Sequence, residues 1–316
     1  MIPQWPGTPS SEALRIARHA EARRFRGVWF GETAGFDAGA LAGRLSVETP
    51  DLRQFIGPLP VTLRSGPQLA MLAGSLAAFG SSIELILGAS SPIITERWHG
   101  RRRGSVAALR DTMHAARRAA SGERTDIVDG ASTTTGFKAA LASPSTPIGL
   151  AALGPRALRL GGQRADRVVL NFVTPDSARE LISIVQAGAE SVGVECPPIS
   201  VWMHAAVDPG PASEQTARRF LSGYLRAPGY AEEFDRQGFG QIVAEAQRRP
   251  VRELEALCTD DVLDSAFAFG SGELVRGRAA AFEALGIDVA VVPVTADDPD
   301  GIRTLDALAP DTEVCS

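Results

Sequence analysis

The chain alternates short apolar runs with longer segments in which apolar residues recur at helical spacing. Apolar runs of four to eight residues bounded by Gly, Pro or polar residues are typical of buried strands. Alternation of such runs with helical segments predicts βα units around a parallel sheet. We expect strands over residues 27–32, 52–57, 83–88, 147–153, 167–172, 199–207 and 289–294, and helices over residues 11–24, 68–79, 105–120, 155–161, 176–192 and 273–285.

This pattern gives seven strands, and Met1-Ile2-Pro3 reads as the stub of an eighth. Eight βα units would close a (β/α)8 TIM barrel of about 250 residues plus insertions. A mostly helical excursion over residues 213–263 is one such insertion. A doubly wound sheet is the alternative, but no Gly-x-Gly-x-x-Gly motif follows an early strand, so we expect the α/β barrel. No change in composition marks a linker, which predicts a single domain over residues 1–316.

Composition narrows the function classes. The 316 residues are 44% hydrophobic and 22% charged, which is typical of a globular protein. The net charge of −5 gives no basis for binding nucleic acid or an anionic membrane surface, and no apolar run is long enough to span a membrane. The first residues lack the features of a signal peptide, which favours a cytoplasmic location. Cys196, Cys258 and Cys315 are too scattered for a metal site or a disulfide framework.

The segment after the expected strand 83–88 gathers the densest chemistry of the chain. Within four residues it places the carboxylate of Glu96, a guanidinium, the indole of Trp98 and the imidazole of His99. In parallel α/β proteins ligands bind at the carboxyl ends of the strands. This loop is therefore the first candidate for a functional site.

Three segments in order, 27–32, 90–100 and 147–166, resemble the luciferase-like monooxygenase superfamily. The closer similarity is to its coenzyme F420-dependent branch, which includes methylenetetrahydromethanopterin reductase. The resemblance covers most of the chain. It implies a (β/α)8 barrel, often a homodimer, that binds a deazaflavin (F420) or a flavin (FMN) at the carboxyl ends of the strands, with a small molecule as substrate.

The chain departs from the family pattern in three places. The first strand is reduced to the stub Met1-Ile2-Pro3-Gln4. Glu32-Thr33 stand where many F420 enzymes have Asp-His. Ser90-Ser91 stand where an acidic residue often lies near the deazaflavin, and the nearest carboxylate is that of Glu96. The resemblance therefore supports the same fold for this chain more strongly than it supports the same catalytic residues.

Two motifs are candidates for binding the cofactor. Gly57-Pro58 aligns with a family bulge that often contains a cis peptide bond, which predicts a cis bond here; an ordinary trans turn is the alternative. Gly154-Pro155-Arg156 opens a helix, where free amides and an arginine favour a phosphate group; a plain helix start with a solvated arginine is the alternative. The resemblance also implies that Ser90 and Ser91 bind the cofactor.

The remaining candidates concern catalysis and substrate binding. His99 is the best candidate for proton transfer because imidazole titrates near neutral pH, although it could simply pack beside Trp98. Glu32 and Glu96 are the candidate carboxylates. His204 is either a substrate-pocket residue or a core histidine whose hydrogen bonds are satisfied. The candidates for substrate contact are Thr33, Trp98, Asn171, Trp202 and His204.

Three functions follow. The first is an oxidoreductase that transfers hydride between F420 and a C=N, C=C or C=O group of a small molecule. The second is an FMN-dependent luciferase-like monooxygenase. The third is a barrel that has lost redox activity and binds or isomerises a metabolite. The fold does not choose among them, since this barrel hosts many chemistries.

Overall fold

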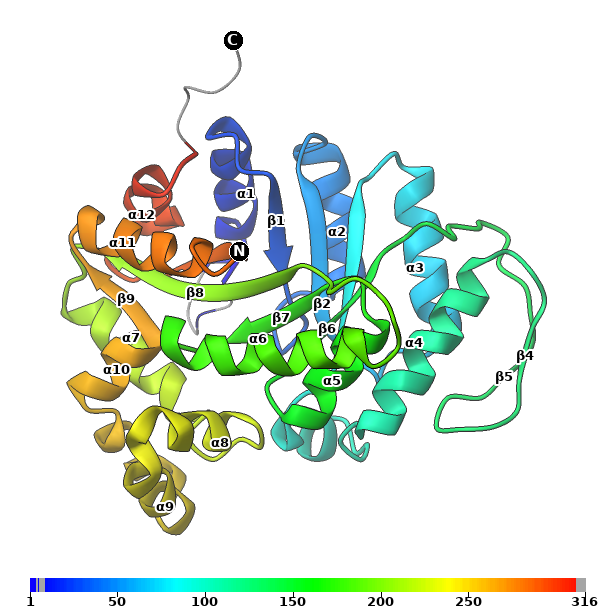
Figure 1. Cartoon of the computed structure of the whole chain (residues 1–316). Coiled ribbons are helices and arrows are strands. Elements are labelled where there is room, and N and C mark those ends of the chain that lie inside the picture. Colours follow the sequence, from blue (N-terminus) through cyan, green and yellow to red (C-terminus); the bar gives the residue numbers. More distant parts are fainter. Residues whose placement is uncertain (4, 6–8, 311–316) are drawn as a thin grey trace. The chain divides into compact units, whose positions relative to one another are not determined.

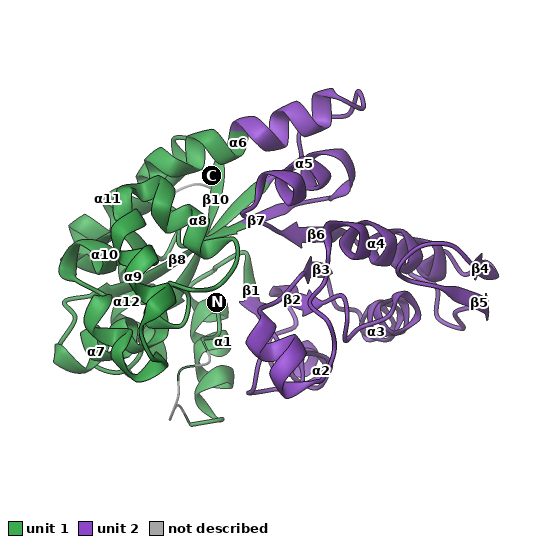
Figure 2. Cartoon of the chain, turned by 90° about the horizontal axis from the view of Figure 1, so that it is seen from below, with its two compact units in different colours: residues 1–28, 170–182, 199–316 green, residues 29–169, 183–198 purple. Residues whose placement is uncertain are grey.

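The computed structural model describes residues 1–3, 5 and 9–310 (Figure 1). The chain forms two compact units (Figure 2). Unit 1 contains Met1–Val28, Leu170–Ile182 and Ile199–Ser316, and unit 2 contains Trp29–Val169 and Ser183–Pro198. The units are interleaved in sequence, because strand β1 (Gly27–Phe30), strand β7 (Val168–Asn171) and helix α6 (Pro175–Glu190) each begin in one unit and end in the other. The single-domain expectation stays a prediction.

Unit 2 is built on parallel strands that follow one another in the order β1, β2, β3, β6, β7. In β3 every residue is buried, as its mostly apolar sequence predicts, and the one charged residue, Glu84, is paired with Arg53 and Arg167. The further strands are β2 (Arg53–Pro60), β3 (Ile83–Gly88) and β6 (Ile148–Ala151), and the helices are α2 (Ala38–Glu48), α3 (Gly66–Ala78), the π-helix η1 (Ile93–Trp98), α4 (Val106–Ala120) and α5 (Pro155–Arg164). A two-stranded antiparallel hairpin, β4 (Thr125–Ile127) and β5 (Thr134–Phe137), interrupts the alternation after α4.

Local sequence signals start the helices of unit 2. Ser65 and Gln68 form a reciprocal capping box at the first turn of α3, and Asp37 caps α2 by accepting the Ala40 amide at 2.9 Å. Such caps satisfy amides that otherwise lack a partner at a helix start. They also fix where each helix leaves the preceding loop, and these loops carry the candidate site.

Unit 1 contains the remaining strands. β8 (Ile199–Val207) pairs in parallel with both β9 (Phe267–Gly270) and β10 (Ile287–Pro293). The expected helical excursion is confirmed as α7 (Pro211–Ser222), α8 (Tyr230–Phe234), the π-helix η2 (Asp235–Phe239), α9 (Gly240–Arg248), two short 3-10 turns (Val251–Glu253 and Glu255–Leu257) and α10 (Asp260–Ala266). The other helices are α1 (Glu12–Ala22), α11 (Gly272–Glu283), the 3-10 turn η5 (Pro299–Gly301) and α12 (Ile302–Ala307).

The expected first-strand stub does not form a strand. Residues 1–3 have no strand geometry and Gln4 lies outside the described residues, while an unpredicted short strand, β9, pairs with β8 off the main strand path. The N-terminal segment lies beside β10: the Met1 amine donates to the Val291 carbonyl, and Trp5 Nε1 donates to the Pro293 carbonyl at 2.9 Å. Ile2 is 1% exposed. This segment therefore packs into the core and donates hydrogen bonds to β10, although it does not form a strand.

Within the described residues, no helix is both long and apolar enough to cross a membrane. The other strands and helices fall where the hydrophobic pattern predicts them, and the additions are α2, η1, the β4–β5 hairpin, β9, η5 and α12.

Candidate functional site

A polar cleft of about 640 Å³ opens in unit 2 at the carboxyl ends of β1 and β2. Its walls come from the loop after β1, the loop after β2 and the segment between β3 and α4, which we call the β3–α4 loop (residues 89–104). The lining residues are Glu32, Thr33, Ala34, Gly35, Phe36, Asp37, Pro60, Thr62, Leu63, Arg64, Ile94, His99 and Arg101. Three sequence-predicted site residues, Glu32, Thr33 and His99, thus share one cleft.

An ion-pair network occupies one wall of this cleft. Arg64 binds both carboxylate oxygens of Glu32, at 3.1 Å through Nε and 2.6 Å through Nη2, and its Nη2 also contacts Asp37 at 2.6 Å. The two carboxylates raise the pKa of Arg64. The pKa of Asp37 is lowered, first by its hydrogen bond from the Ala40 amide and also by Arg64. Glu32 is therefore a paired carboxylate that shapes the cleft.

Sequence reasoning did not find Arg64. Its position directly before the Ser65 helix cap and after an apolar strand was the available signal, because this junction belongs to the carboxyl end of the strand. Its two partners lie 32 and 27 positions earlier in the chain, so only the folded backbone brings the three charges together.

Strand β2, whose last residue Pro60 lines the cleft, contains the Gly57-Pro58 bulge. The peptide bond between these residues is cis, as predicted, and the pairing of β2 with β3 shifts register between Ile56 and Leu59. Gly57 has φ +147°, and a Cβ there would lie 2.1 Å from the Ile86 carbonyl oxygen. A Cβ on Gly88 would lie 2.7 Å from the Pro58 ring. Both glycines are needed for the close approach of the two strands.

The β3–α4 loop contains most of the candidates that the sequence singled out. Ser91 starts the π-helix: its side-chain oxygen accepts the Ile94 amide at 3.4 Å, and its carbonyl accepts the Thr95 amide at 3.0 Å. Trp98 is 55% exposed, and Glu96 is exposed and accepts the Arg103 amide. Of the loop candidates Ser90, Ser91, Glu96, Trp98 and His99, only His99 lines the cleft.

The residues predicted to bind a phosphate group lie at the start of α5. Gly154 is the N-cap and supplies no side-chain hydrogen bond, and Pro155 occupies the first turn. The Arg156 side chain is exposed and makes no hydrogen bond or ion pair to any residue that the structure describes. A Cβ on Gly154 would meet no atom within 4 Å, so the space beside this terminus is open.

The other predicted substrate residues lie in unit 1, in an aromatic cluster. His204 is 3% exposed and stacks on Phe172 with 4.5 Å between ring centroids. Its Nε2 lies 3.0 Å from Asn171 Oδ1, and Asn171 Nδ2 donates to the Tyr230 hydroxyl at 3.2 Å. Trp202 is partly buried and packs against the same cluster.

Burial lowers the pKa of His204 from 6.5 to about 3, so the ring is neutral near pH 7. Because Asn171 presents its carbonyl oxygen, the proton of the neutral ring lies on Nε2. Nδ1 is buried and lacks a hydrogen-bond partner among the described residues. His204 and Tyr230 thus contact the two ends of the Asn171 amide.

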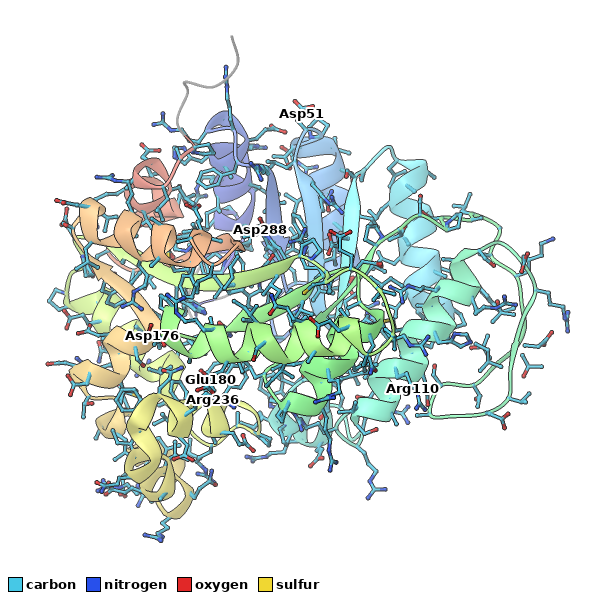
Figure 3. All side chains as sticks on the ribbon, viewed as in Figure 1. Asp51, Arg110, Asp176, Glu180, Arg236 and Asp288 are labelled. Carbon is cyan, nitrogen blue, oxygen red and sulfur yellow. The ribbon has the colours of Figure 1, made fainter. Side chains whose placement is uncertain are left out.

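The helical excursion is fastened next to this cluster. Gln237 Nε2 donates to the Phe172 carbonyl at 2.9 Å, and Arg236 on η2 contacts Glu180 on α6 at 3.2 Å; Figure 3 labels both members of this pair. These contacts hold Tyr230 within reach of Asn171.

The buried histidine predicts an acid-dependent loss of stability. Below pH 6.5 the unfolded chain protonates this ring, whereas the folded protein does not until about pH 3. Stability should therefore fall as the pH decreases across this interval, by up to about 1.4 kcal/mol per pH unit from this group. His204→Phe should remove that part of the slope in urea unfolding measured from pH 7 to pH 4. Exposed His114 is the control, and equal slopes for wild type and His204→Phe would contradict the prediction.

Comparison with known proteins places these features in a family. A candidate coenzyme F420-dependent oxidoreductase of Mycobacterium tuberculosis is 25% identical over 96% of both chains. The coenzyme F420-dependent tetrahydromethanopterin reductase of Methanopyrus kandleri has a TM-score of 0.79 at 15% identity, over 96% of this chain and 95% of that one. An F420-dependent secondary alcohol dehydrogenase has a TM-score of 0.72 at 16% identity, over 95% and 94%.

FMN enzymes are also similar. The oxygenating constituent of 3,6-diketocamphane monooxygenase from Pseudomonas putida, solved with FMN, has a TM-score of 0.66 at 16% identity, over 96% of this chain and 93% of that one. At such identities the structural likeness shows the fold, which is the luciferase-like (β/α)8 class expected from the sequence. The family model for luciferase-like monooxygenases matches residues 2–289, so the chain belongs to the luciferase-like monooxygenase family.

Proposed function

We propose that this protein is an F420-dependent oxidoreductase that transfers hydride between the deazaflavin and a C=N, C=C or C=O group of a small molecule. The observation that carries the proposal is the polar cleft of about 640 Å³, which lies at the carboxyl ends of β1 and β2 in a chain of this family. The similarity to F420-dependent proteins in sequence and in fold supports this cofactor over FMN.

The residues of unit 2 fit a polar, anionic cofactor. The Thr62 hydroxyl in the cleft wall is buried and has no hydrogen-bond partner among the described residues, so it has bonding capacity left for a ligand. The start of α5 offers a helix N-terminus with an exposed arginine, which favours a phosphate group. When bound, F420 would supply the hydride chemistry. Gly57, Pro58, Ser90, Ser91, Gly154, Pro155 and Arg156 would hold it.

The protein's own residues then have three tasks. The Glu32–Arg64 pair holds a fixed pattern of charge in the cleft, since a bidentate pair restrains both side chains. His99, which lines the same cleft, would supply or accept the proton that accompanies hydride transfer. Thr33 and Trp98 would contact the substrate from the loop after β1 and the β3–α4 loop. Asn171, Trp202 and His204 of unit 1 stay predicted substrate residues, and within that unit His204 and Asn171 are hydrogen-bonded to one another.

Titration of the purified protein with F420, FMN and FAD tests the proposal. We expect quenching of F420 fluorescence at lower protein concentration than quenching of FMN fluorescence. Tight FMN binding without F420 binding would replace the proposal with the FMN-dependent monooxygenase. Binding of none of the three would favour a barrel without redox activity.

The phosphate role of the α5 terminus predicts an affinity difference between two arginines. Arg156→Ala should weaken cofactor binding roughly 10- to 100-fold, because one charge-assisted hydrogen bond is worth about 1.5–3 kcal/mol. Arg102→Ala should change it by less than about fivefold, as an exposed surface charge does. Both dissociation constants come from the same fluorescence titration. Equal constants would reject the phosphate role of Arg156.

A further inference from the structure

The β3–α4 loop supplies three of the residues that line the cleft, Ile94, His99 and Arg101. The backbones of the latter two are tied back into the loop, since the His99 amide donates to the Ile94 carbonyl at 3.2 Å and the Arg101 amide donates to the Thr95 carbonyl at 2.8 Å. The shape of this cleft wall therefore depends on the conformation of the whole loop.

The loop begins with a strained residue. Ser90 has φ +61°, which is left-handed backbone that serine adopts at a cost and glycine adopts freely. A residue in this region persists only where its surroundings hold it there. The next residue, Ser91, starts the π-helix through its carbonyl, so a change of backbone at Ser90 would move that helix and the cleft residues beyond it.

One side chain closes the loop onto Ser90. Half-buried Arg103 donates from Nε to the Ser90 carbonyl oxygen at 2.8 Å, a charge-assisted hydrogen bond across thirteen residues. Its backbone amide donates to Glu96 Oε1 at 3.3 Å, and the Gly104 amide donates to the Ala89 carbonyl at 3.4 Å. The two ends of the loop thus meet at Arg103.

The three consecutive arginines have different environments. Arg101 lines the cleft, and Arg103 is bound to Ser90. Arg102 is exposed and makes no side-chain hydrogen bond or ion pair with the described part of the chain. Arg102 is therefore a matched control for Arg103: the same residue type, one position away, without the contact.

We propose that Arg103 is a positioning residue, which keeps Ser90 in the left-handed conformation and so holds His99 and Arg101 in the cleft wall. The effect on the loop stands on the contacts alone, whereas an effect on cofactor binding rests on the function proposed above. The proposal makes Ser90 and Arg103 a coupled pair in which the side chain stabilises a backbone conformation that serine alone disfavours.

Hydrogen–deuterium exchange of the cofactor-free protein tests the loop directly. Arg103→Ala should speed exchange of the Thr95 and Arg101 amides about tenfold or more relative to Arg102→Ala, since one charge-assisted hydrogen bond is lost. Adding Ser90→Gly to Arg103→Ala should restore part of the protection, because glycine needs no clamp at φ +61°. Equal exchange in Arg103→Ala and Arg102→Ala, or no rescue by glycine, would overturn the proposal.

Two further measurements keep the outcomes distinct. If Arg103→Ala does not fold, Arg103→Gln, which keeps a neutral donor, takes its place. Its Thr95 and Arg101 amides should exchange faster than those of Arg102→Ala, and equal exchange would again overturn the proposal. F420 titration of the same variants should then show weaker binding for the Arg103 variants than for Arg102→Ala. If wild type binds neither F420 nor FMN, the proposed function fails while the exchange data still decide the role of Arg103.

Discussion

Gly57→Ala is expected to destabilise the protein by about 3 kcal/mol or more, which is the sum of a strained backbone and a steric clash. Gly57 has φ +147°, where an L side chain is disfavoured. The new Cβ would lie 2.1 Å from the Ile86 carbonyl oxygen and 2.8 Å from Ile86 Cβ. Neither atom can move without separating β2 from β3.

Urea unfolding followed by far-ultraviolet circular dichroism measures this effect. Gly43→Ala, on helix α2, is the matched control, because its Cβ would meet no atom within 4 Å. There the same substitution should be neutral or stabilising by up to about 1 kcal/mol, as Gly→Ala is within helices. A Gly57→Ala midpoint as high as that of Gly43→Ala would show that the strands separate easily at the bulge.

His99→Gln is expected to slow turnover by roughly 10²–10⁴-fold, the usual contribution of one positioned acid or base. His99 lines the same cleft as Glu32, Thr33 and Arg64, so a substrate bound in the cleft would lie next to the imidazole. Glutamine keeps similar size and hydrogen bonding but cannot transfer a proton near neutral pH. Cofactor affinity and melting temperature should stay close to wild type, because the His99 side chain is exposed.

The measurement uses reduced F420 and a panel of imines, enones and ketones, with the best substrate taken forward to single-turnover kinetics. His114→Gln on α4 is the control, since this histidine is exposed and is not among the residues that line the cleft. An unchanged rate in His99→Gln would end the proton-transfer role. A lowered melting temperature with an unchanged rate would show that His99 only packs in the loop.

The strands and helices with long, regular patterns could be read from the sequence. β3 is buried on both faces and appears as an apolar run interrupted only by Glu84, and α4 has a Ser105 cap and a clear helical period. β9 (Phe267–Gly270) was missed because it follows helix α10 (Asp260–Ala266) directly, with no Gly, Pro or polar residue between them to mark the start of a strand. The stub at the N-terminus forms no strand, because its burial comes from packing against β10, which any apolar segment can provide.

Helix α2 was also missed, although Asp37 and the spacing of Leu41 and Leu45 were available as signals. Its many small residues weaken the contrast between the apolar and polar faces. The cis Gly57-Pro58 bond was predicted correctly because proline and the family resemblance both point to it.

For this protein, the sequence by itself determined the βα alternation, the family, and the strand ends at which Glu32, Thr33 and His99 lie, because these depend on local periodicity and short motifs. Tertiary structure alone decided which polar and charged groups meet. It paired Arg64 with Glu32 and Asp37, buried His204 against Asn171, and turned Arg103 back onto Ser90. The physical reason is that a side chain's partner depends on the distance between backbone segments, which a local pattern does not encode.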